Sequence, residues 1–318
     1  MTQLRQPTMF KIKNILGTQC LSKEDINRVL DTTHSFKEIS TRSIKKVPTL
    51  RGKTVINLFF EPSTRTRTSF EIAGKRLSAD VINITGSSSS LVKGENLIDT
   101  ALNLEAMRPD IMVVRHAHSG ASQMISQFIQ CPVINAGDGY HEHPTQALLD
   151  LYTIREAKNS LKGLNVLIVG DIAHSRVVRS NIYAMKTMGM NVKLVGPSTM
   201  IPVEIEKMDV TVDHYLEDAI PNADVIMMLR LQKERQSKYL LPSIREYSSL
   251  YCLTPKLLEK AKDDVLIIHP GPVNRGIEIS LEVMESDRSL ILNQVTNGVA
   301  LRMALLYLIL GGNNDSLN

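Results

Sequence analysis

The sequence lacks the features that would place the chain in a membrane or in an oxidising compartment. Its longest apolar run, Ala304 to Leu310, is far too short to span a bilayer. The first residues contain no apolar stretch of the kind that forms a signal peptide. The three cysteines, Cys20, Cys131 and Cys252, are odd in number and have no metal-binding spacing. We therefore expect reduced structural thiols in a cytoplasmic protein with no membrane partner.

The chain also lacks any local concentration of charge. Its 37 Lys and Arg against 33 Asp and Glu give a net charge of +4 over 318 residues. The basic residues are scattered, whereas a face that binds nucleic acid needs them gathered together. We therefore expect no nucleic-acid partner, while the mild positive excess suits small anionic substrates. The length allows for two domains with substantial cores.

No motif for a cofactor or a metal is present. The strand predicted at residues 165–169 runs into Gly170-Asp171, but no Gly-x-Gly-x-x-Gly follows, which argues against a dinucleotide. His141-Glu142-His143 lacks the His-x-x-x-His spacing that puts two zinc ligands on one helical face, so we expect no metal. No activated serine or cysteine nucleophile is evident. Direct transfer between two bound ligands is therefore the economical mechanism.

A strand-to-helix junction with the character of an anion site is what the chain does have. The apolar run Val55 to Phe60 predicts a strand, and Ser63-Thr64-Arg65-Thr66-Arg67 predicts the start of a helix. The free N–H groups and positive dipole end of such a helix attract phosphate, and arginine adds a planar fork. The alternative is a plain capped helix with solvated arginines and a salt bridge from Glu71. Capping accounts for one hydroxyl and not for the whole run, so we favour the anion site.

Three further arginines are predicted at or near the carboxyl ends of strands. Arg115 follows the strand at 110–114, where an ion pair with a nearby carboxylate is an equally good explanation. Arg176 opens a helix after Ser175, and such a helix start favours an anion. Arg230 begins an Arg-x-Gln-Lys-Glu-Arg run that, taken alone, also fits a solvated loop. Two βα-repeating halves with arginines at these edges predict two anionic ligands.

The remaining elements are predicted from their patterns. A helix is expected over 18–46 with Ser22 as its N-cap, and the apolar segment 299–310 predicts a helix that must be buried. Four serines followed by Lys93-Gly94-Glu95 indicate a linker when taken alone. His269-Pro270-Gly271-Pro272 predicts a sharp bend after the strand at 265–268.

The motif at 63–67, preceded by Phe-Glu and followed by Ser-Phe-Glu, resembles the carbamoyl-phosphate motif of the aspartate and ornithine carbamoyltransferases. His143-Pro144-Thr145-Gln146 resembles their second motif, and five motifs occur in family order. The resemblance implies an α/β fold of two similar doubly wound domains with mainly parallel sheets and the active site in the cleft between them. It implies a carbamoyl-phosphate domain over 1–142 plus a C-terminal helix at about 293–312, and an aspartate domain over 143–292.

The resemblance also implies the residues of the site. The phosphate would be held by Ser63, Thr64, Arg65, Thr66 and Lys93. The carbonyl oxygen would be surrounded by Thr66, Arg115 and His143, so the catalytic set is Arg65, Thr66, Arg115 and His143. The carbamoyl nitrogen would be received by Gln146 and by the backbone carbonyls of Pro270 and Gly271; some relatives have leucine where this chain has Gly271. Ser90 and Lys93 would reach into a neighbouring subunit, which implies an obligate homotrimer with shared active sites.

The motif at Arg230 is similar to the aspartate branch of the family. Aspartate would be positioned by Lys93, Arg176, Arg230 and Gln232, whereas an ornithine enzyme would show an aspartate and a Ser-Met-Gly element there. The resemblance therefore implies carbamoyl transfer from carbamoyl phosphate to the amino group of L-aspartate, the committed step of de novo pyrimidine biosynthesis, with no cofactor. The alternatives are a carbamoyltransferase for another amino acid and an inert homologue that binds effectors or partners. Further assembly with a regulatory chain or with dihydroorotase stays open.

Overall fold

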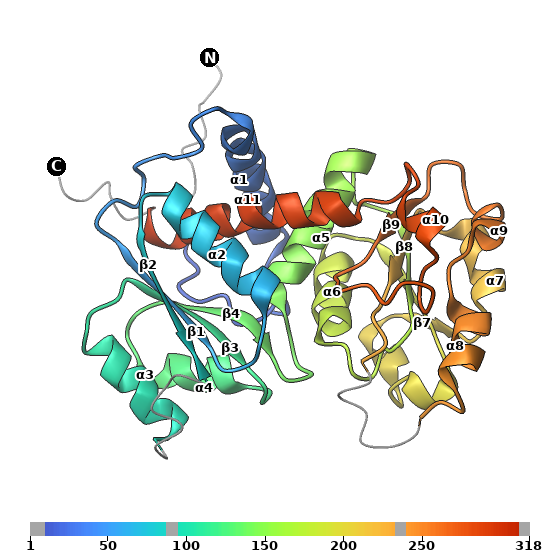
Figure 1. Cartoon of the computed structure of the whole chain (residues 1–318), viewed down its shortest axis with the longest axis horizontal. Coiled ribbons are helices and arrows are strands. Elements are labelled where there is room, and N and C mark those ends of the chain that lie inside the picture. The colour runs from blue at the N-terminus through green and yellow to red at the C-terminus, as the bar shows by residue number, and fades with distance from the viewer. Residues whose placement is uncertain (1–9, 87–94, 233–239, 312–318) are drawn as a thin grey trace. The chain divides into compact units, whose positions relative to one another are not determined.

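The structure is a computed structural model that describes residues 10–86, 95–232 and 240–311 (Figure 1). It divides into two compact units. Unit 1 comprises Met1–Leu16, Asn27–Ala136 and Val299–Asn318, and unit 2 comprises Gly17–Ile26 and Gly137–Gly298. Each unit has a parallel sheet with helices on its faces, which confirms the predicted fold class.

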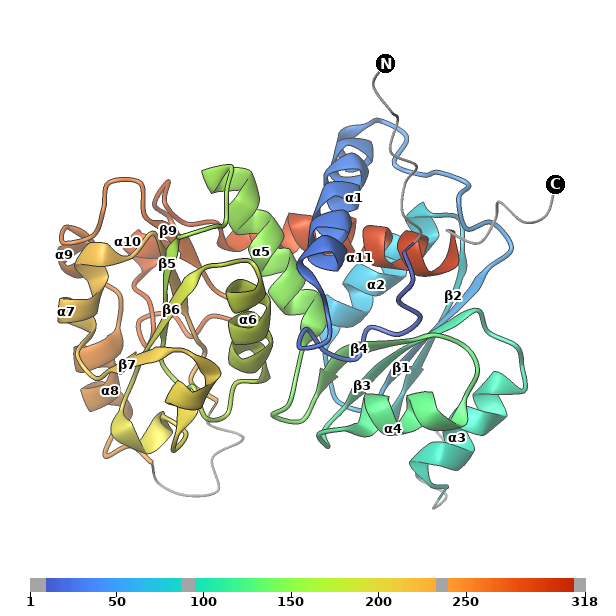
Figure 2. The same ribbon diagram turned by 180° about the vertical axis from the view of Figure 1, so that it is seen from behind.

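The sheet of unit 1 has the strand order β2-β1-β3-β4. Its strands are β1 (Thr54–Phe59), β2 (Asp80–Thr85), β3 (Ile111–His116) and β4 (Val133–Asp138). The central strands β1 and β3 are buried, near-continuous apolar runs, and such strands need helices on both faces. Those helices are α2 (Thr64–Arg76) on one face and α3 (Leu97–Glu105) with α4 (Ala121–Phe128) on the other (Figure 1, Figure 2).

The sheet of unit 2 has the strand order β7-β6-β5-β8-β9. Its strands are β5 (Asn165–Val169), β6 (Asn191–Val195), β7 (Thr211–Asp213), β8 (Val225–Met228) and β9 (Leu266–Ile268). One face carries α5 (Pro144–Lys158) and α6 (Arg176–Thr187) (Figure 2). A core cluster on the other face joins β5 and β8 to α7 (Leu216–Ala219), α8 (Ile244–Tyr251), α9 (Pro255–Leu258) and α10 (Leu281–Met284).

The first helix is shorter than the predicted span of 18–46: α1 is Lys23–Thr41. The predicted N-cap is confirmed, because Ser22 Oγ accepts a hydrogen bond from Asp25 N at 3.1 Å. The C-terminal end was overestimated because the chain turns away beyond α1. Val47 N donates to Arg76 O at 2.7 Å, and the residue before Pro48 is disfavoured in a helix.

The last helix, α11 (Ile291–Leu310), begins before the predicted segment 299–310; that segment is almost entirely buried, as its composition predicts, whereas Leu292 and Val295 in the first turns are exposed. In unit 1 it packs against α2, where the guanidinium carbon of Arg302 lies 5.2 Å from the ring centre of Phe70. Arg302 Nη1 also donates to Ser69 Oγ at 3.0 Å. In the described part of the chain, no helix is long and apolar enough to cross a membrane.

Candidate functional site

Both sheets reverse their strand order at strands that carry the predicted motifs. In unit 1 the reversal lies between β1 and β3, and in unit 2 it lies between β5 and β8. At such a switch point the loops beyond the carboxyl ends of the two strands diverge, and ligands of open α/β sheets bind there. Each unit therefore has one edge at which a ligand is expected, and the motifs lie at these two edges.

The edge of unit 1 is built from the junction between β1 and α2. Ser63 is the N-cap of α2, with φ of −159° and ψ of 90°, yet its side chain makes no capping hydrogen bond. The first turn of α2 contains no acidic residue. Ser63 therefore occupies the capping position without the side-chain bond of a plain cap, while the salt bridge expected from Glu71 is present, to Lys75 at 2.6 Å. The first turn itself thus contributes no carboxylate to the positive end of the helix, which favours an anion.

Arg115 lies directly beside this junction because of the sheet register. Arg115 pairs with Phe59 across the parallel strands, and Phe60 N donates to Arg115 O at 2.9 Å. The guanidinium is held by two acceptors: Nη1 donates to Ala136 O at 3.1 Å, and Nη2 lies 3.5 Å from Glu61 Oε1. Both explanations offered by the sequence are thus present, since Arg115 forms an ion pair and also lies at the switch point.

The other predicted residues of unit 1 lie on the same helix start or outside the described residues. Thr64 and Arg65 are exposed in the first turn of α2, and Thr66 is buried. Ser90 and Lys93 fall outside the described residues. The preceding residue Gly86 lies close against Phe60 at the same edge of the sheet. A Cβ on Gly86 would be only 3.2 Å from Phe60 Cα.

In unit 2 the second motif forms the start of α5. His143 is the N-cap and Pro144 takes the first position of the helix, where its missing N–H costs nothing. His143 N donates to Ser180 Oγ at 2.8 Å, which fixes the backbone of this turn against α6. Gln146, in the first turn, is buried and donates from Nε2 to Asp150 Oδ1 at 2.9 Å.

The residues beside His143 have structural partners. Glu142 is buried and accepts from Thr18 N at 2.7 Å and from Ser180 Oγ at 2.8 Å. His141 Nδ1 lies 3.2 Å from Asp138 Oδ2. Among the residues that the structure describes, no group of three or more His, Cys, Asp or Glu side chains could hold a metal ion.

The switch point of unit 2 brings Gln232 to the loop after β5. Gln232 N donates to Asp171 Oδ2 at 3.3 Å, and Gln232 Nε2 donates to His174 O at 3.0 Å. Asp171 is buried, and its Oδ1 lies 2.6 Å from His174 Nδ1. Arg176 is only 4% exposed and donates from Nη1 to Gly139 O at 3.3 Å. Arg230, just beyond β8, lies at the same carboxyl edge.

The loop after β9 is fixed by a buried histidine. His269 Nδ1 accepts from Gly271 N at 2.8 Å, and His269 Nε2 lies 3.3 Å from Glu278 Oε1. Because Nδ1 accepts, the ring proton of the neutral histidine is on Nε2 and is donated to Glu278. Gly271 has φ of +65°, a backbone conformation in which a side chain would be strained.

No supporting role was assigned from the sequence to five residues that hold these side chains in place. They are Glu61, Asp150, Asp171, His174 and Glu278. Four of the five carry carboxyl groups, and three of these, Asp150, Asp171 and Glu278, are fully buried. A signal was present for Asp171, which follows Gly170 at the end of a predicted strand. The signal for Asp150 was weaker, namely an acidic residue within the apolar pattern of 147–154.

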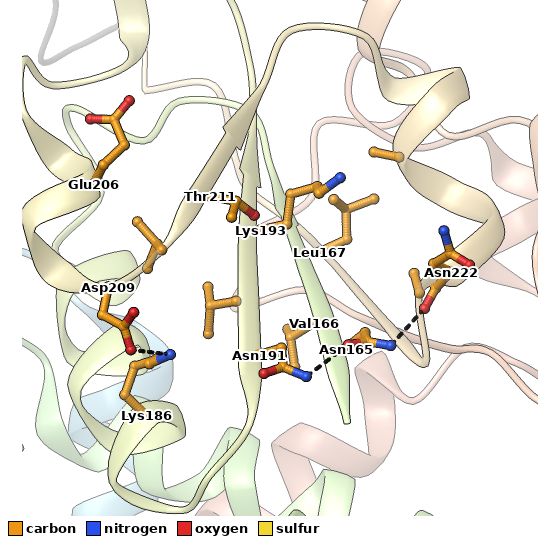
Figure 3. Close-up of a pocket in the computed structure, with 14 residues that line it drawn as sticks. Asn165, Val166, Leu167, Lys186, Asn191, Lys193, Glu206, Asp209, Thr211 and Asn222 are labelled. Carbon is orange, nitrogen blue, oxygen red and sulfur yellow. Dashed lines mark hydrogen bonds and ion pairs between the residues drawn. The ribbon is translucent and has the colours of Figure 1, made fainter. Parts of the chain in front are cut away.

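A separate pocket of about 430 Å³ lies in unit 2 at the amino ends of β5, β6 and β7 (Figure 3). Several of its polar lining groups bind one another. Asn191 Nδ2 donates to Asn165 Oδ1 at 3.0 Å, Asn165 Nδ2 donates to Asn222 O at 3.2 Å, and Lys186 pairs with Asp209 at 2.5 Å. This is the sheet edge opposite to Asp171 and Arg230, so we do not assign it to the substrates.

Comparison with known proteins assigns the two halves of the chain to two domain models of one family. The family model for the carbamoyl-phosphate-binding domain of aspartate/ornithine carbamoyltransferases matches residues 13–156. The model for the Asp/Orn-binding domain of the same family matches residues 162–309. The aspartate carbamoyltransferase catalytic subunit of Syntrophus aciditrophicus is 62% identical over 302 residues, which cover 95% of this chain and 98% of that protein.

Two solved structures show how far the fold alone discriminates. Aspartate transcarbamoylase from Trypanosoma cruzi in complex with carbamoyl phosphate superposes with a TM-score of 0.86 at 30% identity, over 94% of this chain and 96% of that one. The ornithine carbamoyltransferase of Pyrococcus furiosus gives 0.83 at 28% identity, over 94% and 97%. Likeness of fold therefore does not distinguish an aspartate enzyme from an ornithine enzyme. That distinction has to be argued from local residues and from sequence identity to relatives.

Proposed function

Because this chain belongs to the aspartate/ornithine carbamoyltransferase family, we propose that it transfers the carbamoyl group of carbamoyl phosphate to the amino group of L-aspartate. The products are N-carbamoyl-L-aspartate and phosphate. One observation carries this proposal most: each unit has its arginine-bearing motif at the switch point of its sheet. Two anion-binding edges fit a reaction between a phosphate compound and a dicarboxylate.

The edge of unit 1 has the chemistry for the phosphate. The first turn of α2 offers backbone N–H groups, the hydroxyls of Ser63, Thr64 and Thr66, and the guanidinium of Arg65. The proposed role of Lys93, and of Ser90 beside it, rests on the family resemblance. We expect Arg115 to donate to the carbonyl oxygen of carbamoyl phosphate. Its Nη2 would then give up the 3.5 Å ion-pair contact with Glu61 when the substrate binds.

In unit 2, His143 and Gln146 suit the carbamoyl group. A histidine at a helix start can donate to the carbonyl oxygen, where negative charge develops as the amine attacks. Gln146 presents an amide within the same helical turn. The backbone carbonyls of Pro270 and Gly271 accept from the carbamoyl nitrogen in this proposal, and the bond from Gly271 N to His269 supports the loop that carries them.

The residues that we propose bind the substrate L-aspartate carry a positive charge or an amide group. Such groups are what the two carboxylates of this substrate require. Arg176 and Arg230 supply the charge, and Gln232 is held against Asp171 and His174 in an ordered position. An ammonium-bearing side chain such as that of ornithine would need a carboxylate in this place. The relative at 62% identity is named as an aspartate enzyme, which supports the same choice.

The reaction balances without a protein nucleophile. The unprotonated amine of aspartate forms a C–N bond with the carbamoyl carbon while the bond from that carbon to the phosphate oxygen breaks. The amine proton passes to the leaving phosphate. The protein's contribution is to hold both substrates in reacting geometry and to stabilise the charge on the carbonyl oxygen.

We further propose that the chain acts as a homotrimer with shared sites, at the committed step of de novo pyrimidine biosynthesis. Among the described residues of unit 1, β2 is an edge strand of the sheet, and its Ile82 side chain is 49% exposed. An unpaired strand edge with exposed apolar side chains is a natural surface for another protein chain.

Phosphate release from carbamoyl phosphate tests the function. The purified chain is assayed with L-aspartate and with L-ornithine in parallel, and the products are identified by mass spectrometry. Aspartate-dependent release with N-carbamoyl-L-aspartate formed is the expected result. A preference for ornithine would overturn the argument from Arg230 and Gln232, and no turnover with either amino acid would favour an inert homologue.

A further inference from the structure

Three side-chain amides meet at one buried carboxylate, that of Asp150. Its Oδ1 accepts from Gln146 Nε2 at 2.9 Å and from Gln294 Nε2 at 2.7 Å. Its Oδ2 accepts from Asn181 Nδ2 at 2.9 Å. The Asp150 side chain is fully buried, and Gln294 and Asn181 are buried with it. All four residues belong to unit 2.

A carboxylate determines which way the facing amides point. The oxygen and nitrogen of a glutamine amide are almost the same size, so packing alone does not orient the group, whereas an ionised carboxylate offers only acceptors. In the structure Gln146 turns its nitrogen toward Asp150, where Nε2 donates to Oδ1. Its Oε1 is then directed elsewhere as an acceptor, which is the group needed to recognise an –NH₂ of a ligand.

The second arm from Asp150 reaches the loop after β9. Gln294 is oriented in the same way, so that its Oε1 is available to accept from His269 N, at 2.8 Å. His269 in turn accepts from Gly271 N through Nδ1 at 2.8 Å. A continuous path of short hydrogen bonds thus joins Asp150 to the loop that carries the carbonyls of Pro270 and Gly271.

A purely structural role for Asp150 is the alternative. Its bond to Gln294 joins α5 to α11, and a second bond joins the same helices one turn further along. There, Asn297 Nδ2 donates to Thr153 Oγ1 at 3.0 Å. Asn297 is fully buried as well, and its amide donates to Thr153 and Glu156 instead of to Asp150. This pair provides a matched control for the packing of the two helices.

We propose that Asp150 is a positioning residue for recognition of the carbamoyl nitrogen. It orients Gln146 directly and the loop at 269–272 through Gln294, so that one buried carboxylate aligns both sets of acceptors for the –NH₂ group. This inference rests on the proposed function, because it assigns the –NH₂ group to Gln146 and the loop.

The test compares two stable ligands that differ only at this group. Phosphonoacetamide has a methylene in place of the bridging oxygen of carbamoyl phosphate, and 2-oxopropylphosphonate has in addition a methyl group in place of –NH₂. Calorimetry gives the ratio of their affinities for the wild-type chain and for the Gln146→Ala, Asp150→Ala, Gln294→Ala and Asn297→Ala variants. Thermal unfolding of each variant reports whether it is folded.

The wild-type chain is expected to prefer the amide, and Gln146→Ala to lower that preference about tenfold, the loss of a hydrogen bond of ordinary strength. Asp150→Ala should lower it at least as far as Gln146→Ala does, because it also releases the Gln294 arm, and the double variant should lower it no further than Asp150→Ala alone. Gln294→Ala should lower it in part. Asn297→Ala should lower the thermal stability and leave the preference unchanged.

Two results would overturn the proposal while leaving the proposed function intact. One is an Asp150→Ala variant with the wild-type preference when Gln146→Ala has lost it. The other applies if Asp150→Ala does not fold: a Gln294→Ala variant that discriminates as well as Asn297→Ala. If Gln146→Ala itself keeps the wild-type preference, the role given to Gln146 in the proposed function is wrong, and the role of Asp150 falls with it.

Discussion

Arg115 Nη2 lies 3.5 Å from Glu61 Oε1, so two residues far apart in the sequence meet at the neighbouring ends of β3 and β1. The parallel register of the two strands brings them together, since Arg115 is paired with Phe59 and Glu61 follows two residues later. The same guanidinium also donates to Ala136 O at 3.1 Å. A planar fork is thereby held in one orientation at the edge where we propose that carbamoyl phosphate binds.

Replacing Arg115 by lysine tests this geometry. The variant keeps the charge but cannot make two fixed hydrogen bonds while donating to a substrate oxygen. We expect Arg115→Lys to lower kcat/KM by about 10²–10³, as for other lost donors to a developing oxyanion. Arg108→Lys is the matched control, since Arg108 precedes the amino end of β3 and is exposed. Equal activity of the two variants would contradict the role of Arg115.

Arg65 tests the anion site at the start of α2. Arg65→Ala is expected to lower kcat by about 10²–10³, because the guanidinium stabilises charge on the transferring group and its leaving phosphate. Arg76→Ala at the other end of the same helix, where Arg76 donates to Ser40 Oγ at 3.0 Å, should retain activity. A loss of less than about tenfold for Arg65→Ala would exclude this residue from transition-state stabilisation.

Arg230 tests the assignment of the amino-acid substrate. Arg230→Ala should raise the KM for L-aspartate about 10- to 100-fold, the effect of losing a charge-assisted hydrogen bond. The affinity for phosphonoacetamide should not change. Arg245→Ala on α8, an exposed arginine of the same unit, serves as the control. If Arg230→Ala weakened both ligands equally, Arg230 would not be specific for aspartate.

Mixing two inactive variants tests the shared site of the proposed homotrimer. Chains with Arg65→Ala and chains with Lys93→Ala are each expected to be nearly inactive. After subunits are exchanged, mixed trimers should regain part of the activity, because some sites then contain intact residues from both chains. Exchange is verified by native mass spectrometry, and the absence of any recovery in verified mixed trimers would exclude a site shared in this way.

The cysteines provide a test of burial through their reactivity. Burial, with a smaller contribution from Glu105, raises the pKa of Cys131 from 9.0 to about 11. Burial, with a smaller contribution from Glu278, raises the pKa of Cys252 to about 11. Cys20 is exposed. Since only the thiolate reacts, iodoacetamide at about pH 8 should modify Cys20 first.

Raising the pH should increase the rate at which the buried cysteines are modified. The thiolate fraction of a thiol with a pKa near 11 still increases about tenfold per pH unit up to that value. Modification of Cys131 should therefore accelerate steadily between about pH 8 and pH 10 in the folded chain. Peptide mapping by mass spectrometry measures each rate, and a plateau for Cys131 below about pH 9 would contradict the raised pKa.

The local sequence by itself determined most elements of this protein and the residue types at its candidate site. Short apolar runs predict the strands, and amphipathic segments predict the helices. The hydroxyls and arginines at 63–67 give the start of α2 its anion-binding character, whatever its position in the fold. The predicted bounds were wrong at two helices. α1 is shorter than predicted because its end depends on the bond from Val47 to Arg76, and α11 begins at Ile291, ahead of the apolar segment 299–310.

The tertiary structure decided which of these residues act together. Glu61 meets Arg115 through sheet register, and Gln294 reaches Asp150 across 144 positions through the packing of α11 on α5. Strand order, register and helix packing are non-local, since many arrangements satisfy the same apolar pattern until the whole core is packed. The sequence therefore shows each of the buried carboxylates that orient the site, but it does not show which side chains each of them contacts.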